Sequence, residues 1–511
     1  MIVTSRPWSY WLPGMPCMPC VPAVAAVPTG HAQVRLEQLD GMRALATTWI
    51  LCGHFLDWRS HRGLFTGFLA RGNVPVCYYI VLSGFVTHWA YGKHNFALHA
   101  PELQSFFRTR LGRIAFSYYF FFGLGLVQRV MDDWPLSPMC TGLGALMLEA
   151  WDPACEIVIQ SFTWPSAYAQ YGPGPNPAGW TIGTLVFCWV CYPVLAVTLH
   201  RAVGPPGEGR WQQLLGLAIV AYVLAVLPPL VMLRMNAHRP DGQRIPALTM
   251  QYLEEFPPCR LADFSLGVLT AALMKLPGAT EWTGWPLVGW GAALTLVALV
   301  LCAPLQLPKL PGHLRHDAEA LMVSGPSALW ALMIAAMASP HTWLARHPML
   351  IRVGQYSFAA YLLQFWLAHI FVELQKCASG HKHGLQPWWM LAFIFCVWTL
   401  ASVYTECVEL PFVRVLRGTI GWVQVLHTLA RVVPAFAVGC LLLSLPTWVE
   451  RCLPKWGWSC KQDILVDGAE ELAYLALFLY RDVAQDVSSH VSDLKSAVSH
   501  HSTQLIGHRN S

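Results

Sequence analysis

Ten long apolar segments follow one another through most of the chain, and this succession constrains the fold more than any other feature. Each is about as long as a helix that crosses the roughly 30 Å hydrocarbon core of a bilayer. The pattern predicts an all-α polytopic membrane protein with about ten core transmembrane helices, and an apolar run at 427–447 predicts a possible eleventh. The ten segments are 41–58, 73–91, 112–130, 178–199, 212–234, 261–276, 285–304, 320–339, 350–373 and 387–406.

The composition supports a membrane protein and excludes some classes of function. Of the 511 residues, 55% are hydrophobic and only 12% are charged, which is about half the charged share of an ordinary soluble domain. The 24 tryptophans suit the two interfaces of a membrane. The net charge of +5 is spread along the loops, so nothing favours a nucleic-acid partner. Basic residues are balanced between the two sets of loops, so the charge rule leaves the orientation open.

The chain divides into four parts by composition. Residues 1–40 form a proline-rich leader, 41–418 a membrane domain, 419–447 an additional transmembrane helix, and 448–511 a polar tail. Apolar residues in the tail recur every three or four positions from Leu479 to Val498, which predicts an amphipathic helix. That helix either lies on the membrane or protein surface or mediates self-association.

The 16 cysteines do not indicate a disulfide framework, because most of them fall within the apolar segments. Cys17 and Cys20 have the spacing of a metal or redox pair. They lack a second pair of ligands nearby, so we expect no metal site.

Two ionisable residues lie on the first apolar segment, LDGMRALATTWILCGHF. Arg43 and His54 are eleven positions apart, so they lie on one face of a helix, roughly 16 Å apart along its axis. This spacing puts the arginine near one membrane boundary and the imidazole near the bilayer centre. Ionisable groups inside a membrane are costly, and those that are kept there usually serve a function.

A second basic pair, Arg110 and Arg113, lies at the start of the third apolar segment. A spacing of three residues puts both guanidinium groups on one helical face, where they match the oxygens of a phosphate. The alternative is that both arginines anchor the helix among lipid headgroups.

Several of these runs together resemble the acyltransferase 3 family of multi-pass membrane O-acyltransferases. The first-segment run with Arg43 and His54 is similar to the family's first-helix signature, and the Arg110 and Arg113 pair matches its RxxR motif. Four further runs occur in family order, over roughly residues 36–418: YYIVLSGFVTHW, RLADFSLG, GQYSFAAYLLQF and ELPFVRVLR.

The chain departs from the family pattern at two positions. Leu185 stands where the fourth-helix motif usually has a glutamate, and Gln364 where a histidine is common on the ninth helix. Either another carboxylate assists, with Asp57, Asp263 and Glu406 as the candidates, or activity is reduced or lost.

The resemblance implies acyl transfer from acyl-coenzyme A, a co-substrate, to a hydroxyl acceptor such as a carbohydrate or lipid, with no tightly bound cofactor. His54 is the candidate general base, or a covalent carrier of the acyl group. Arg110 and Arg113 would hold the nucleotide phosphates. Arg43 would contact a phosphate or oxyanion, or would pair with Asp40.

Three further residues complete the candidate substrate pocket. Ser83, next to Gly84, suits close helix packing better than nucleophilic catalysis, because no base can be assigned to it. Tyr361 and Gln364, three residues apart on one face, either line the acceptor pocket or join helices by hydrogen bonds. Two other functions stay open: a transporter or channel, and a catalytically inert scaffold of the same fold.

Overall fold

The computed structural model describes residues 36–57, 64–94, 100–132, 176–204, 210–236, 255–279, 286–302, 322–339, 345–381 and 384–416, with a few isolated positions besides. This part of the chain is helical and contains no β-strand, only one isolated bridge between Leu56 and Leu385. The Cys17 and Cys20 pair, most of the segment 427–447 and the amphipathic tail lie outside the described residues.

The helices follow the order of the predicted segments. The first group is α1 (Glu37–Phe55), α2 (Leu64–Leu69), α3 (Val74–Tyr91), α4 (Ala100–Asp132), α8 (Gly179–Val203) and α9 (Trp211–Asn236). The second group is α11 (Pro257–Met274), α13 (Pro286–Cys302), α15 (Ser327–Ala338), α16 (Pro348–Gly354), α17 (Ser357–Ser379), α18 (Pro387–Tyr404), the π-helical turn η1 (Thr405–Glu409) and α19 (Leu410–Leu416).

The predicted number of transmembrane helices is confirmed only in part. Four described helices are long and apolar enough to cross a membrane: Gly179–Val203, Trp211–Val231, Ser357–Lys376 and Pro387–Arg414. Leu287–Leu301 and Met322–Ala338 are apolar but shorter. The segment 350–373 is two helices rather than one, because α16 ends at Gly354 and α17 begins at Ser357. The count of about ten spans is therefore not established.

Helices α3 and α11 pack more closely than ordinary side chains would permit. A Cβ atom on Gly84 would collide with the carbonyl oxygen of Phe264, and one on Gly267 with that of Val81. Both helices therefore present glycine at the contact, as helices in membranes often do. This confirms the predicted packing role of Gly84.

We expect Gly84→Ala to destabilise the protein by about 1 to 3 kcal/mol, because the added methyl group forces the two backbones apart. Gly216→Ala on α9 is the matched control, because a Cβ there meets nothing within 4 Å. Thermal unfolding of the detergent-purified proteins measures both changes. Equal unfolding midpoints for the two variants would contradict the close α3–α11 contact.

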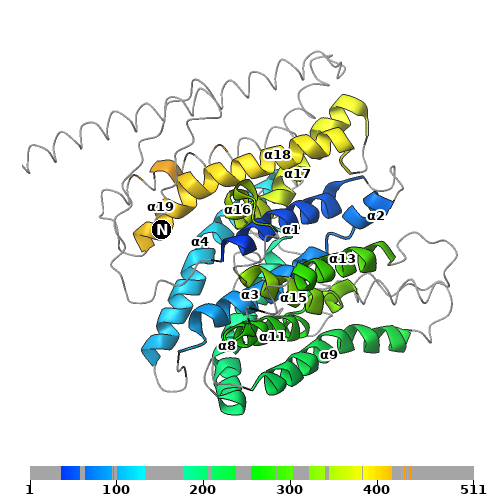
Figure 1. Cartoon of the computed structure of the whole chain (residues 1–511). Coiled ribbons are helices and arrows are strands. Elements are labelled where there is room, and N and C mark those ends of the chain that lie inside the picture. Colours follow the sequence, from blue (N-terminus) through cyan, green and yellow to red (C-terminus); the bar gives the residue numbers. More distant parts are fainter. Residues whose placement is uncertain are drawn as a thin grey trace, which may run out of the picture. The chain divides into compact units, whose positions relative to one another are not determined.

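The amino-terminal half of α1 is held against α16 by two further glycines. A Cβ on Gly354 would collide with the carbonyl oxygen of Asp40, and one on Gly41 with that of Ala345. Figure 1 shows α1 beside α16 and α17. These contacts set the position of the helix that carries Arg43 and His54.

Candidate active site

Arg43 forms an ion pair with Asp40, which lies one turn earlier on the same helix. Its Nη1 atom lies 3.1 Å from Oδ1 of Asp40, and both side chains are partly buried. Of the two roles left open by the sequence, the structure therefore shows the pairing with Asp40. The ion pair fixes the guanidinium toward the amino-terminal turn of α1.

His54 lies in the last turn of α1 and is exposed. The helix ends one residue later, at Phe55. The imidazole contacts the ring of Phe365 on α17, with centroids 5.4 Å apart. Within the described part of the chain, no hydrogen bond to the imidazole is found. Both ring nitrogens are thus available to a substrate.

The end of α1 is fixed by backbone hydrogen bonds to the loop before α18. The amide of Asp57 donates to the carbonyl of Leu385 over 2.9 Å, and the amide of Leu385 donates to that of Phe55 over 2.6 Å. These bonds hold the chain directly after His54. The imidazole therefore extends from a rigid support, as a catalytic group requires.

Tyr79 is a polar residue of this region that the sequence analysis did not single out. Its hydroxyl donates to the carbonyl of Arg43 over 2.9 Å and is also hydrogen-bonded to Thr47. Its position in the run YYIVLSGF, on the helix that carries Ser83, was the available signal. Tyr79 joins α3 to α1 between Arg43 and His54.

Ser83 accepts a hydrogen bond from Nε1 of Trp189 on α8, over 3.1 Å. The Ser83 side chain is buried, with 8% of its surface exposed. The hydrogen bond from Trp189 therefore links α3 to α8 in the interior. This contact agrees with a packing role and gives no support for a nucleophile.

Arg110 lies ten residues into α4, which begins at Ala100. The helix therefore extends beyond the predicted apolar segment 112–130 on its amino-terminal side. The guanidinium donates to the carbonyl of Val86 over 3.3 Å, and it lies 5.2 Å from the ring centroid of Tyr91 and 5.9 Å from that of Trp189. Arg113 lies one turn further along α4, and its side chain is outside the described part of the structure.

Arg110 and His54 lie at opposite ends of α3. Gly53, next to His54, contacts Gly72 just before α3 begins, whereas Arg110 bonds to Val86 near its other end. The stretch from Val74 to Val86 measures about 18 Å along the axis. The structure therefore places the imidazole and the arginine far apart, so only an extended ligand can contact both.

Tyr361 and Gln364 occupy successive turns of α17. The Tyr361 hydroxyl is hydrogen-bonded to Thr181 on α8, so this residue does join two helices. Gln364 is 0% exposed, and neither atom of its amide has a hydrogen-bond partner among the described residues. Among the described residues, Gln364 therefore does not join helices by a hydrogen bond.

The three carboxylates proposed to replace the missing glutamate are all engaged elsewhere. Oδ2 of Asp57 lies 2.8 Å from Nε2 of His381, and a Glu406 carboxylate oxygen accepts from the Tyr356 hydroxyl over 2.9 Å. Asp263 is fully buried and paired with Arg260 over 3.0 Å. Each carboxylate thus has a structural partner of its own.

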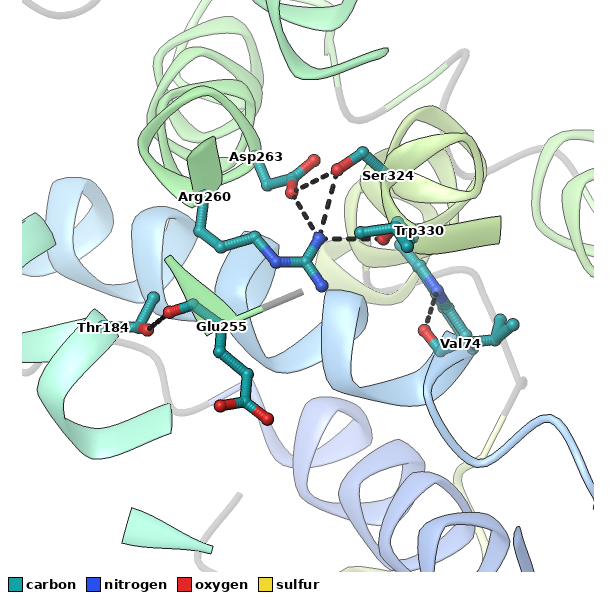
Figure 2. A network of polar contacts seen from close by, with 8 residues as sticks. Val74, Thr184, Glu255, Arg260, Asp263, Ser324 and Trp330 are labelled. Atoms are coloured by element: carbon teal, nitrogen blue, oxygen red, sulfur yellow. Dashed lines mark hydrogen bonds and ion pairs between the residues drawn. The ribbon is translucent and has the colours of Figure 1, made fainter. Parts of the chain in front are cut away.

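Glu255 is a fourth carboxylate, which the sequence analysis did not propose. Its backbone carbonyl accepts a hydrogen bond from Thr184, the residue before Leu185, over 3.2 Å. Figure 2 shows its carboxylate pointing away from Arg260 and Asp263. The carboxylate also interacts electrostatically with Tyr361. Glu255 therefore lies against the turn of α8 where the expected glutamate is missing.

Taken together, these contacts place an arginine near one end of α3 and an exposed imidazole near the other end. A neutral imidazole has one ring nitrogen that can accept a proton, and a guanidinium favours phosphate oxygens. Such an arrangement suits a reaction on a long, phosphate-bearing donor.

Comparison with known proteins identifies the class. A model of the acyltransferase 3 family, described as an acyltransferase domain, matches residues 36–406. The chain belongs to this family, and it is an acyltransferase. Its long apolar helices and its family together indicate an integral membrane protein.

One curated relative matches over most of its length. It is the acyltransferase MdmB of Streptomyces mycarofaciens, 24% identical over 342 residues, which are 65% of this chain and 79% of the relative. No solved structure matches the chain.

Proposed function

We propose that this acyltransferase is a multi-pass membrane enzyme that moves an acyl group, such as acetyl, from acyl-coenzyme A to a hydroxyl of a carbohydrate or lipid. The observation that carries the proposal is the separation of Arg110 from His54 along α3. Coenzyme A carries phosphates at one end and its thioester at the other end of a long arm, so it suits two distant contacts.

In the proposed reaction, Arg110 and Arg113 bind the phosphates of the donor, and the arm extends toward His54. The imidazole takes the proton of the acceptor hydroxyl while the hydroxyl oxygen bonds to the thioester carbonyl carbon. The carbon–sulfur bond then breaks, and the thiolate takes the proton from the imidazolium. The products are an ester and free coenzyme A, and no tightly bound cofactor is needed.

The backbone of Arg43 contacts Tyr79 of α3, which lies between the two ends of the proposed donor path. The ion pair with Asp40 fixes the Arg43 side chain, so it presents a positive charge at a constant position along the path of the donor. Ser83 and Tyr361 shape the pocket through their hydrogen bonds to α8.

Radiolabelled acetyl-coenzyme A tests the function on the purified protein in lipid vesicles. We expect release of coenzyme A and transfer of label to a hydroxyl acceptor, both dependent on His54. Solute flux without thioester cleavage would instead indicate a transporter. Neither flux nor cleavage would indicate an inert scaffold.

We expect Arg110→Ala to weaken coenzyme A binding by a factor of about 10 to 150. It removes charge-assisted hydrogen bonds to phosphate, worth roughly 1.5 to 3 kcal/mol. Arg108→Ala is the control, because Arg108 is exposed and lies two positions away on the same helix. Titration calorimetry with coenzyme A compares them. Equal affinity in both variants would assign Arg110 to helix anchoring alone.

A further inference from the structure

Two fully buried glutamines on α17 differ sharply in their hydrogen bonding. Gln375 donates from Nε2 to the carbonyl of Gly384 over 2.7 Å, and its Oε1 accepts from the amide of Gln386 over 2.8 Å. Gln364 is equally buried, at 0% exposure, yet in the described part of the structure both of its amide atoms are unpartnered.

This difference calls for a physical reason, because a buried polar group without a partner costs about 1 to 3 kcal/mol. Buried polar groups in native proteins are nearly always hydrogen-bonded to protein, water or a ligand. An apolar side chain of the same size at position 364 would avoid the cost. The amide is therefore best explained by a partner that arrives with the substrate.

The surroundings of Gln364 indicate which part of the substrate it meets. Phe365, the next residue, contacts the ring of His54, and Tyr361, one turn earlier, is hydrogen-bonded to α8. Gln364 thus lies on the stretch of α17 between these two contacts. In the proposed reaction, the thioester reaches His54 beside this stretch of α17.

We propose that Gln364 is a catalytic residue that donates a hydrogen bond from Nε2 to the acyl carbonyl oxygen, an assignment that rests on the proposed acyl transfer. When the acceptor oxygen bonds to the carbonyl carbon, an electron pair moves onto the carbonyl oxygen. The amide N–H stabilises this negative charge until the carbon–sulfur bond breaks and the carbonyl forms again. Oε1 accepts from a hydroxyl or amide N–H of the bound substrates.

The two glutamines provide a matched test with opposite expected outcomes. In Gln364→Met we expect kcat to fall about 100-fold, with little change in the KM for acyl-coenzyme A and an unfolding midpoint equal to or above that of the wild type. In Gln375→Met we expect a lower unfolding midpoint and a wild-type kcat per folded molecule, because two satisfied hydrogen bonds are lost there.

Two further variants separate the donor role from the acceptor role of the amide. Gln364→His keeps an N–H donor and should retain more activity than Gln364→Met. Gln364→Glu keeps only acceptor atoms when ionised and should be as inactive as Gln364→Met. Full activity in Gln364→Glu together with loss in Gln364→His would overturn the donor assignment.

The wild type distinguishes failure of this assignment from failure of the proposed function. If the wild type cleaves acetyl-coenzyme A and folded Gln364→Met turns over at the same rate, the role of Gln364 is refuted and the function stands. If the wild type does not cleave the thioester, the proposed function is refuted and the assignment falls with it.

Discussion

Replacing His54 by alanine is expected to abolish acyl transfer, with a loss of about 100-fold or more in kcat, because general-base catalysis contributes about that much or more. The imidazole is exposed at the end of α1, and its described contacts are to the rings of Phe55 and Phe365. Its removal should therefore leave the fold intact. Thioester cleavage and thermal unfolding of the same preparation measure the two effects separately.

His427→Ala is a suitable control for the loss of an exposed histidine. It should match the wild type in both measurements. Wild-type turnover in folded His54→Ala would remove the residue from the mechanism.

The role of His54 as a base or as a covalent carrier can be decided with the donor alone. Incubation without an acceptor should leave His54 unmodified if it is the base. An acetylated His54 peptide, seen by mass spectrometry, would establish the carrier role instead.

Replacing Arg260 by methionine is expected to produce the largest loss of stability, about 3 to 5 kcal/mol. The guanidinium is 1% exposed, and its Nη1 donates to Asp263 over 3.0 Å, to the carbonyl of Val323 over 2.8 Å and to Ser324 over 3.1 Å. Figure 2 shows this cluster, in which the Ser324 hydroxyl also donates to Asp263. Without the arginine, a fully buried carboxylate would lose its countercharge.

The double variant Arg260→Met with Asp263→Leu should recover most of this stability, because it removes both charges together. Tryptophan fluorescence during thermal unfolding in detergent compares the two proteins. A single variant as stable as the wild type would show that the hydrogen bonds of Arg260 to Val323 and Ser324 do not hold α11 to the segment before α15.

The sequence by itself determined where the helices lie and which residues are candidates for the active site. Apolar segments predict helices because a buried backbone must satisfy its own hydrogen bonds, and α3, α8 and α18 match the predicted ranges closely. The helical repeat alone places Arg43 and His54 on one face of α1. The motif order predicted the acyltransferase 3 family, which the family match confirms.

The tertiary structure alone decided what each side chain contacts. Gln364 and Gln375 are the same residue type on one helix, yet among the described residues only Gln375 has hydrogen-bond partners, from the loop before α18. Asp263 is held by Arg260 and by Ser324, which is 61 residues away in the chain. The partners of Gln375, and Ser324 as a partner of Asp263, lie outside the helix that carries the side chain. Their positions depend on how the segments pack, so local periodicity cannot predict which buried polar group is hydrogen-bonded.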